Sequence, residues 1–444
     1  MNKYRFNYAQ ISAIAFIFII LIGAILLWLP ISSRNREFTP FINALFTSSS
    51  AACVTGLVVY DTFDHFSLFG QAVILSLIQI GGLGFMIVAT LFSLMLKKKI
   101  GLRQRGLLQE SVSTLNIGGV VKLAKHIIIG TVYVELIGAA ILAVKFYPEM
   151  GILRAIYNGI FHSVSAFCNA GFDLMGYFRE SSSLIRYRSD ITVNLVIMSL
   201  IIIGGIGFFV WEDILENKFD FSKYKLHTKI VILATSVLLI VSTILFYIIE
   251  KDNTMKNMNG TGKILASMFQ AVTPRTAGFN TLDISKLRES SILLTIILMF
   301  IGGSPGSTAG GIKTTTFITI LLSFRASMNH SEDLNIFNRR LEPEIVTRAY
   351  SVITTYVFGA SMAIMTICSI QNLALTDVTF EVISALSTVG MSTGITQELN
   401  NFSRLIIVIL MFCGRVGSLS VALAFAEKKV YIPIRKPIEK ISIG

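Results

Sequence analysis

The 444-residue sequence is poor in charged residues, which make up 14% of it, whereas hydrophobic residues make up 53%. An ordinary soluble protein carries roughly 25% charged residues, so a soluble globule of this length could not cover its surface with charge. A disordered chain is excluded as well, because disorder requires low hydrophobicity. The composition therefore indicates a polytopic membrane protein.

Cysteine and histidine are also scarce. The four cysteines, Cys53, Cys168, Cys368 and Cys413, lie in apolar stretches without paired spacing, which favours buried thiols over a disulfide framework or a zinc site. The five histidines are scattered and indicate neither a metal site nor a catalytic base. A membrane enzyme would need converging polar groups at membrane depth, so we expect that the protein is not an enzyme.

Basic residues outnumber acidic ones, 38 against 26, which gives a net charge of +12. In a membrane protein such an excess indicates cytoplasmic loops near anionic lipid rather than nucleic-acid binding. Lys and Arg cluster after the second, fourth, sixth and last apolar runs. We therefore expect those loops and both termini to be cytoplasmic, with membrane lipid as a partner and no nucleic acid.

Eight apolar runs are long enough to cross about 30 Å of hydrocarbon as helices. Within each successive pair of runs lies a shorter stretch rich in small residues, which predicts a re-entrant half-helix that enters from outside. The predicted fold is therefore all-α, with eight transmembrane helices and four half-helices. The spans are 11–29, 69–96, 126–146, 191–210, 230–249, 292–322, 345–370 and 405–425, and the half-helices are 41–53, 155–168, 264–273 and 380–387.

Each predicted half-helix ends in a string of two residues, a glycine and a bulky apolar residue. The four glycines, at positions 56, 171, 278 and 390, are 115, 107 and 112 residues apart, close to a quarter of the chain. This spacing indicates four repeats around one axis, each built from a span, a half-helix, a string and a second span. The predicted repeats are residues 1–116, 117–227, 228–343 and 344–426, followed by a cytoplasmic tail at 427–444.

A non-helical string at membrane depth must be buried in protein or line a wet cavity. Glycine accepts backbone torsions that point successive carbonyl oxygens at the axis, where they replace the hydration shell of a monovalent cation, and the carboxyl ends of the half-helices favour cations. Close helix packing is the alternative explanation for these small residues. The predicted filter comprises Val54, Thr55 and Gly56, then Asn169, Ala170 and Gly171, then Thr276, Ala277 and Gly278, and finally Thr388, Val389 and Gly390, with Leu57, Phe172, Phe279 and Met391 packed behind.

A second glycine-rich marker falls in the span after each string, and it indicates either close packing or function. The four markers are 80–84, 203–207, 301–306 and 413–417. In the third repeat the marker extends into a stretch too rich in Gly, Ser and Pro for stable helix. We predict an intramembrane loop at 303–314 that swings across the ion path, with a simple proline kink as the alternative. The predicted gate comprises Gly303, Ser304, Pro305, Gly306, Ser307, Thr308, Ala309, Gly310, Gly311 and Arg415.

Two charges inside predicted spans are functional hypotheses. Arg415 replaces the second glycine of the marker, so it either repels cations, donates to loop carbonyls between Ser304 and Ala309, or pairs with a buried acid. Glu135 is either a proton or sodium site or a satisfied interfacial acid. Lys313 misses the spacing of a phosphate-binding loop, and we interpret it as a charge at the cytoplasmic end of a span.

The motifs 273–279 and 302–314 resemble those of the Trk/Ktr/HKT superfamily of potassium transporters, most closely the bacterial KtrB/KtrD type. The resemblance implies a multi-pass protein of the bacterial plasma membrane that takes up K⁺ through one pore, forms a homodimer and is gated by the loop. It also implies a cytosolic octameric ring of KtrA/KtrC-type subunits, which binds a nucleotide of ATP/ADP or NAD type, while this chain binds no cofactor.

Gly56 lies where serine accompanies sodium permeation in the superfamily, so the resemblance favours potassium. Cys168 departs from the polar amide that related chains often carry before Asn169. Whether sodium stimulates K⁺ uptake stays open. The alternative function is a sodium- or proton-coupled secondary transporter, which would predict two inverted halves instead of four like-oriented repeats.

Overall fold

The computed structural model describes residues 8–84, 86–90, 108, 120–178, 183–218, 220–331 and 333–417. The predicted tail at 427–444, both termini and most of the loop after the second span lie outside these residues. Within the described part the chain is helical apart from connecting loops and one small hairpin, in which β1 (Asn335–Ile336) pairs antiparallel with β2 (Arg339–Arg340).

Each quarter of the chain follows one element order: a long helix, a shorter helix, a non-helical string and a second helix. The long helices are α1 (Tyr8–Trp28), α7 (Val120–Met150), α11 (Leu226–Glu250) and α15 (Pro343–Ile370), and the shorter ones are α2 (Phe41–Ala52), α8 (Ile152–Phe167), α12 (Gly260–Val272) and α16 (Leu375–Leu386). The second helices are α4 (Leu68–Leu83), α9 (Ile191–Gly205), α13 (Glu289–Phe300) and α17 (Asn401–Val416), with α10 (Phe208–Asn217) and α14 (Thr314–Met328) after breaks. Short connectors are α3 (Thr62–His65), η1 (Pro30–Ser32), η2 (Met175–Tyr177), η3 (Ile185–Tyr187), η4 (Phe221–Lys223), η5 (Ile284–Lys286) and η6 (Ile395–Gln397).

Four described helices are long and apolar enough to cross a membrane, namely α1, α7, α11 and α15. A fifth is reached if α9 and α10 are counted as one bent span. The helices α4 and α13 are apolar but shorter, because each ends at a glycine-rich break. The protein is therefore a helical membrane protein, and the count of eight spans and the repeat boundaries stay predictions.

The predicted continuous spans at 69–96 and 191–210 are wrong in one respect, because both helices break. The breaks fall at Gly84 and Gly207, whose φ angles are +84° and +102°, and α10 leaves α9 at 96°. Gly417, at the end of α17, has a φ of +95°. Only glycine adopts such torsions without strain, so the last glycine of each of these three markers lies at a helix end.

Side chains fix where the second helices begin. Ser67 accepts a hydrogen bond from Gly70 N, Asp190 from Val193 N and Asn400 from Ser403 N, at 3.3, 3.0 and 2.8 Å, so α4, α9 and α17 each start with a side-chain cap. The start of α13 has no side-chain cap of its own and is held by a carboxylate from another helix. Glu250, at the end of α11, accepts from Arg288 N at 2.9 Å and from the Ser291 hydroxyl at 2.6 Å.

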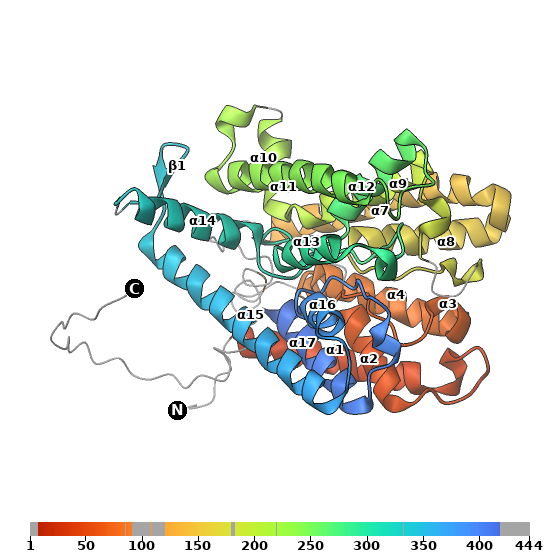
Figure 1. Ribbon diagram of the computed structural model, residues 1–444. Helices are drawn as coiled ribbons and strands as arrows, with labels where there is room; N and C mark the ends of the chain where they lie inside the picture. The colour runs from red at the N-terminus through yellow and green to blue at the C-terminus, as the bar shows by residue number, and fades with distance from the viewer. Residues whose placement is uncertain are drawn as a thin grey trace.

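The two ends of the described chain meet in the fold. Figure 1 shows α17 beside α1 and α2, so the fourth quarter packs against the first. The shorter helices α2, α8, α12 and α16 each pack against the long helix that precedes them. This arrangement brings the carboxyl ends of the four shorter helices, and the strings that follow, toward one place.

Candidate functional site

The four strings share one unusual backbone conformation. Their first residues, Val54, Asn169, Thr276 and Thr388, have φ angles of +58°, +58°, +68° and +51°, and their glycines, Gly56, Gly171, Gly278 and Gly390, have φ angles of +95°, +70°, +80° and +88°. A positive φ is rare for non-glycine residues and is a clear outlier for β-branched ones, with a cost of about 1–3 kcal/mol each. Four copies of the same strained conformation indicate a functional requirement.

Hydrogen bonds from the shorter helices hold the strings in this conformation. In the first, second and fourth repeats the middle residue of the string donates its N–H to the carbonyl five residues earlier, as in Thr55 N to Ser50 O at 2.7 Å. The third repeat differs, because Ala277 N donates to Thr273 O, four residues earlier, at 3.0 Å. Pro274 lies in that turn and has no N–H to donate, and α12 accordingly ends two residues earlier relative to its glycine.

The strings close into a ring. A Cβ added to Gly56 would lie 2.5 Å from the carbonyl oxygen of Ala170 in the second repeat. The same substitution at Gly171 and Gly278 would bring the Cβ to 2.7 and 2.6 Å from Ala277 O and Val389 O. A Cβ on Gly390 would collide with Thr55 O, and Thr55 belongs to the first repeat, so the sequence of neighbouring repeats closes. Each glycine thus faces a carbonyl of the next repeat, and the four strings surround one axis.

A cavity of about 190 Å³ lies against all four string glycines and opens on one side of the ring. Asp61 and Asp173, which lie after the first and second strings, also line it. Asp61 is held against Gly176, and its carboxylate accepts from Phe63 N at 2.8 Å. The cavity, which we name the vestibule, therefore joins the ring of glycines to two acidic side chains.

Burial raises the pKa of Asp173 to about 7, and the neighbouring Asp61 carboxylate acts in the same direction. Met175 N donates to Asp173 at 2.9 Å, which opposes the rise. The sequence reasoning overlooked both acids, although each follows a string glycine closely, Asp61 by five residues and Asp173 by two. An acidic residue two to five positions after a string glycine is the sequence signal that could have identified them.

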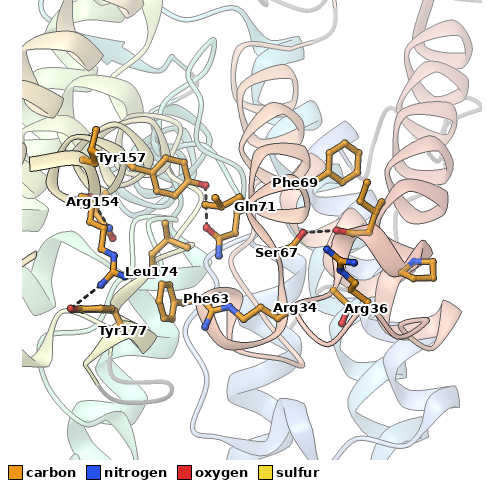
Figure 2. Close-up of a pocket in the computed structure, with 16 residues that line it drawn as sticks. Arg34, Arg36, Phe63, Ser67, Phe69, Gln71, Arg154, Tyr157, Leu174 and Tyr177 are labelled. Carbon is orange, nitrogen blue, oxygen red and sulfur yellow. Dashed lines mark hydrogen bonds between the residues drawn. The ribbon is translucent and has the colours of Figure 1, made fainter.

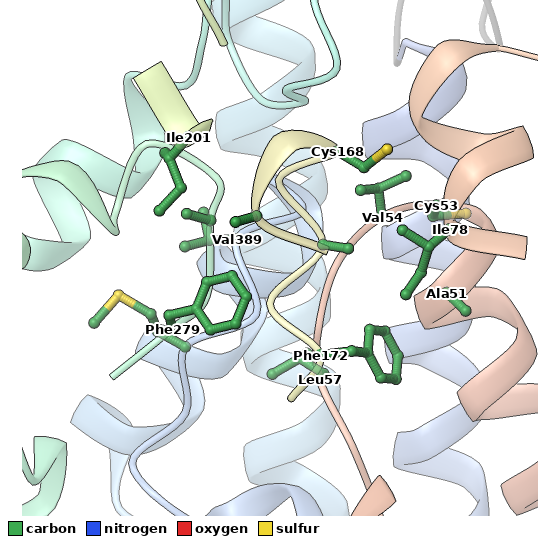
Figure 3. Packing of buried hydrophobic residues seen from close by; sticks show 14 of the residues in the cluster. Ala51, Cys53, Val54, Leu57, Ile78, Cys168, Phe172, Ile201, Phe279 and Val389 are labelled. Carbon is green, nitrogen blue, oxygen red and sulfur yellow. The ribbon is translucent and has the colours of Figure 1, made fainter. Parts of the chain in front are cut away.

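The bulky residues after the glycines are buried: Leu57 and Phe172 are 1% exposed, and Phe279 and Met391 are fully buried. Figure 3 shows Leu57, Phe172 and Phe279 among the packed apolar side chains around the strings. Close packing of this kind resists changes in volume, and its role in holding the diameter of the ring stays a prediction.

The first glycine of each marker brings the second helix against the end of a shorter helix. A Cβ on Gly81, Gly204 or Gly414 would collide with the carbonyl of Ala52, Phe167 or Leu386, each four residues before the string glycine of its repeat. The close-packing interpretation of these glycines is therefore confirmed for the first, second and fourth repeats.

The predicted break in the third repeat is present, since the chain is non-helical between Phe300 and Thr314. Three backbone hydrogen bonds attach this loop to the broken helix of the second repeat. Ser304 N donates to Gly205 O at 3.0 Å, Thr308 N donates to Gly204 O at 3.2 Å, and Gly306 O accepts from Phe208 N at 2.8 Å. The two breaks thus satisfy each other's polar groups, which a membrane interior requires.

The loop also touches the strings of the repeats on either side of it. The Thr308 hydroxyl donates to Phe167 O at 3.1 Å and lies 3.4 Å from the Asn169 side chain. A Cβ on Gly310 would collide with the Thr388 hydroxyl. Asn169 and Thr388 are the first residues of their strings, so the loop lies at the end of the ring opposite the vestibule.

Arg415 links the loop to the first repeat. Its guanidinium donates to Thr308 O in the loop, and also to Gly81 O at 2.5 Å and Gly82 O at 2.8 Å in α4. All three partners are backbone carbonyls, so the geometry matches donation to the loop and not pairing with an acid. The fork of the guanidinium suits this bridge, because it offers several donors in one plane.

Lys313, which we interpreted as a charge at the cytoplasmic end of a span, also contacts the loop. Its side chain turns back onto the loop and donates to Ala309 O at 2.7 Å and Gly310 O at 3.4 Å. Two cations, Lys313 and Arg415, therefore hold successive carbonyls of the same loop.

Glu135 is 8% exposed and lies next to the end of α8. Its carboxylate accepts from the Gln79 amide at 3.2 Å and lies 3.9 Å from the Cys168 thiol, while its carbonyl accepts from Ser163 at 2.6 Å. The thiol also lies 3.6 Å from the Gln79 side-chain oxygen. Glu135, Gln79 and Cys168 thus form one polar cluster between the first two repeats.

Known proteins share the sequence and the fold of this chain. The TrkH family, described as cation transport protein, matches residues 4–431. Ktr system potassium uptake protein B of Bacillus subtilis is 43% identical over 425 residues, with 95% of this chain and 94% of that protein covered. The potassium/sodium uptake protein NtpJ of Enterococcus hirae is 39% identical, with 99% of this chain and 98% of that protein covered.

The solved structure of the potassium transporter TrkH from Vibrio parahaemolyticus shares the fold. Its TM-score is 0.69 at 18% identity, with 94% of this chain and 85% of that chain covered. The family match over nearly the whole chain and the 43% identity establish the relationship. The chain belongs to the TrkH family of cation transport proteins.

Proposed function

We propose that this chain is the potassium-translocating membrane subunit of a Ktr-type uptake system. The observation that carries the proposal is the ring of four strings, each with positive φ at its first residue and its glycine, and each glycine against a carbonyl of the next repeat. Rings of backbone carbonyls replace the hydration shell of K⁺ in known filters. The names of two relatives, a potassium uptake protein and a potassium/sodium uptake protein, support the same substrate.

In this proposal K⁺ enters from the vestibule, where Asp61 and Asp173 raise its local concentration. It loses water against the carbonyls of the filter, and the loop between Phe300 and Thr314 opens or closes the path on the far side. The eight spans cross the bacterial plasma membrane, with the vestibule outside and both termini in the cytoplasm.

The regulatory part of the proposal rests on the family resemblance and on the loop. A homodimer would sit on a cytosolic nucleotide-binding ring, whose conformational change would bias the loop between two states. Nucleotide would bind the ring and not this chain. A two-state loop needs contacts that exist in one state only, and in this proposal the Arg415 bridge between the loop and α4 breaks when the loop moves.

The test is K⁺ uptake in cells that lack their own potassium uptake systems, with sodium as competitor and with a ring partner co-expressed. Gly56→Ser places a side chain against Ala170 O and should admit sodium or abolish flux. The matched control is Gly359→Ser in α15, where an added Cβ meets nothing within 4 Å. Equal selectivity of the two variants, or no rescue by the expressed wild-type protein, would contradict the proposal.

The cluster around Glu135 supports a second candidate function, coupling of K⁺ uptake to sodium or protons. A buried carboxylate inside a span, with an amide and a thiol as its side-chain partners, is the kind of group that binds a cation or a proton. Glu135→Gln should then abolish the dependence of uptake on sodium or proton gradients. Glu149→Gln, on the same helix but paired with Arg186 at 3.0 Å, should leave it intact. Unchanged coupling in Glu135→Gln would remove this candidate and leave the filter proposal standing.

A further inference from the structure

A large groove, distinct from the vestibule, lies between the first and second repeats. Its volume is about 1170 Å³. The walls come from η1, the starts of α4 and α8, and η2 (Figure 2). Leu174, which lines the groove, directly follows the vestibule residue Asp173. The groove therefore opens at the same end of the molecule as the vestibule, where the helix α1 ends.

Three arginines line the groove: Arg34, Arg36 and Arg154. None of the other described residues that line it is acidic. Within the described part of the chain no ion pair involves these arginines, whereas Arg186 nearby is paired with Glu149 at 3.0 Å. The groove thus concentrates positive charge without internal compensation, which favours an anionic ligand.

Aromatic rings position two of the arginines. The guanidinium of Arg34 lies over the ring of Phe63, 4.0 Å from its centroid, and that of Arg154 lies 5.2 Å from the centroid of Tyr177 and donates to its hydroxyl at 3.2 Å. The two rings meet edge to face at 5.7 Å. A guanidinium stacked on a ring keeps N–H groups at its edge available, which suits bidentate recognition of a phosphate. Figure 2 shows Tyr177, Phe63 and Arg34 side by side, with Arg154 next to Tyr177.

The rest of the wall is apolar and faces outward. Ile31, Leu68 and Leu153 line the groove and are 61%, 71% and 82% exposed. In a helical membrane protein, exposed apolar side chains next to the end of a spanning helix contact acyl chains. The groove therefore combines an anion-binding end with a surface for hydrocarbon, and its volume exceeds the usual 300–1,000 Å³ of a small-molecule site.

We propose that this groove binds one anionic phospholipid of the outer leaflet. The phosphate lies between Arg34 and Arg154, with Arg36 at the rim, and the acyl chains extend over Ile31, Leu68 and Leu153. A second copy of this chain fits less well, because a two-fold interface on this groove would pair three arginines with three arginines. By joining side chains of the first and second repeats, the lipid would stabilise the wall of the vestibule.

Native mass spectrometry of the full-length protein, with equal amounts of phosphatidylglycerol and phosphatidylcholine, tests the proposal without any transport measurement. The double variant Arg34→Gln/Arg154→Gln should bind phosphatidylglycerol about tenfold or more weakly, since each basic residue near a membrane surface contributes about 1 kcal/mol. Arg188→Gln, an exposed arginine on the same side and outside the groove, is the matched control. Arg34→Lys/Arg154→Lys should retain part of the binding.

Phosphatidylglycerol retained equally by wild type and the double variant would overturn the proposal. A fall in the dimeric fraction with lipid retention unchanged would also overturn it and would assign the groove to a second copy. Equal losses of both lipids in the double variant would show a general defect in membrane packing, again against a specific site. Because the readout is lipid mass, it stays interpretable even if the filter proposal fails.

Discussion

Replacing Arg415 by Gln should open the pore in the absence of a regulatory partner. The substitution removes the hydrogen bond to Thr308 O in the loop and those to Gly81 O and Gly82 O in α4. A hydrogen bond to a charged group contributes about 1.5–3 kcal/mol. Loss of the Thr308 bond alone would then raise the ratio of open to closed loop by about 10- to 150-fold.

The assay is ⁸⁶Rb⁺ or K⁺ flux into proteoliposomes that contain the purified chain without a ring partner. The matched control is Arg404→Gln on the same helix, because Arg404 also bonds polar groups, Asn43 at 2.9 Å and Gln397 O at 2.9 Å, but far from the loop. Arg415→Lys keeps the positive charge but loses the planar guanidinium that bonds both the loop and α4. It therefore distinguishes an effect of these hydrogen bonds from electrostatic repulsion of K⁺. A leak in Arg415→Gln no larger than in Arg404→Gln would refute the reasoning, and a wild-type leak in Arg415→Lys would assign the effect to charge.

Three further predictions concern the filter, the vestibule and the attachment of the loop. Gly278→Ala should abolish uptake, because the residue has a φ of +80° and an added Cβ would lie 2.6 Å from Val389 O. Gly359→Ala should leave uptake intact, and whole-cell uptake at equal expression measures both variants. With its pKa raised to about 7, Asp173 is neutral below and negative above that pH, so uptake should rise as external pH goes from about 6 to 8, and Asp173→Asn should flatten this profile at the low level. Gly207→Ala places a Cβ 2.7 Å from Pro305 O at a φ of +102°, so it should detach the loop and raise partner-free flux several-fold in proteoliposomes; an unchanged leak would contradict this.

Much of the site could be predicted from sequence because its chemistry depends on glycine. A string such as 54–56 needs positive φ and a close carbonyl, and glycine is the residue that allows both, so the requirement is visible four times in the chain. The break in the third repeat was equally visible, since Pro305 and its small neighbours cannot continue a helix. The roles of these residues in conduction and gating stay predictions.

The breaks of the other second helices could not be found in the same way. The runs 69–96 and 191–210 are continuously apolar, and hydropathy does not register a torsion at a single residue such as Gly84 or Gly207. The shorter helices also extend further than predicted, as α8 begins at Ile152 and α16 at Leu375, because their first turns are not rich in small residues. The contacts of Lys313 could not be predicted, because its partners are loop carbonyls and no side-chain pattern indicates them.

The broken helix of the second repeat explains why the non-helical loop of the third repeat can exist at membrane depth. Unpaired backbone groups cannot face lipid, so a loop of this length needs partners that are themselves non-helical or at a helix end. Gly204 O and Gly205 O are free to accept because α9 stops there, and Phe208 N is free to donate because α10 starts there. The positive φ of Gly207 creates both conditions at once. The third repeat therefore carries the loop, but the glycine of the second repeat supplies the partners for its backbone polar groups. A change at either position should alter the same loop conformation.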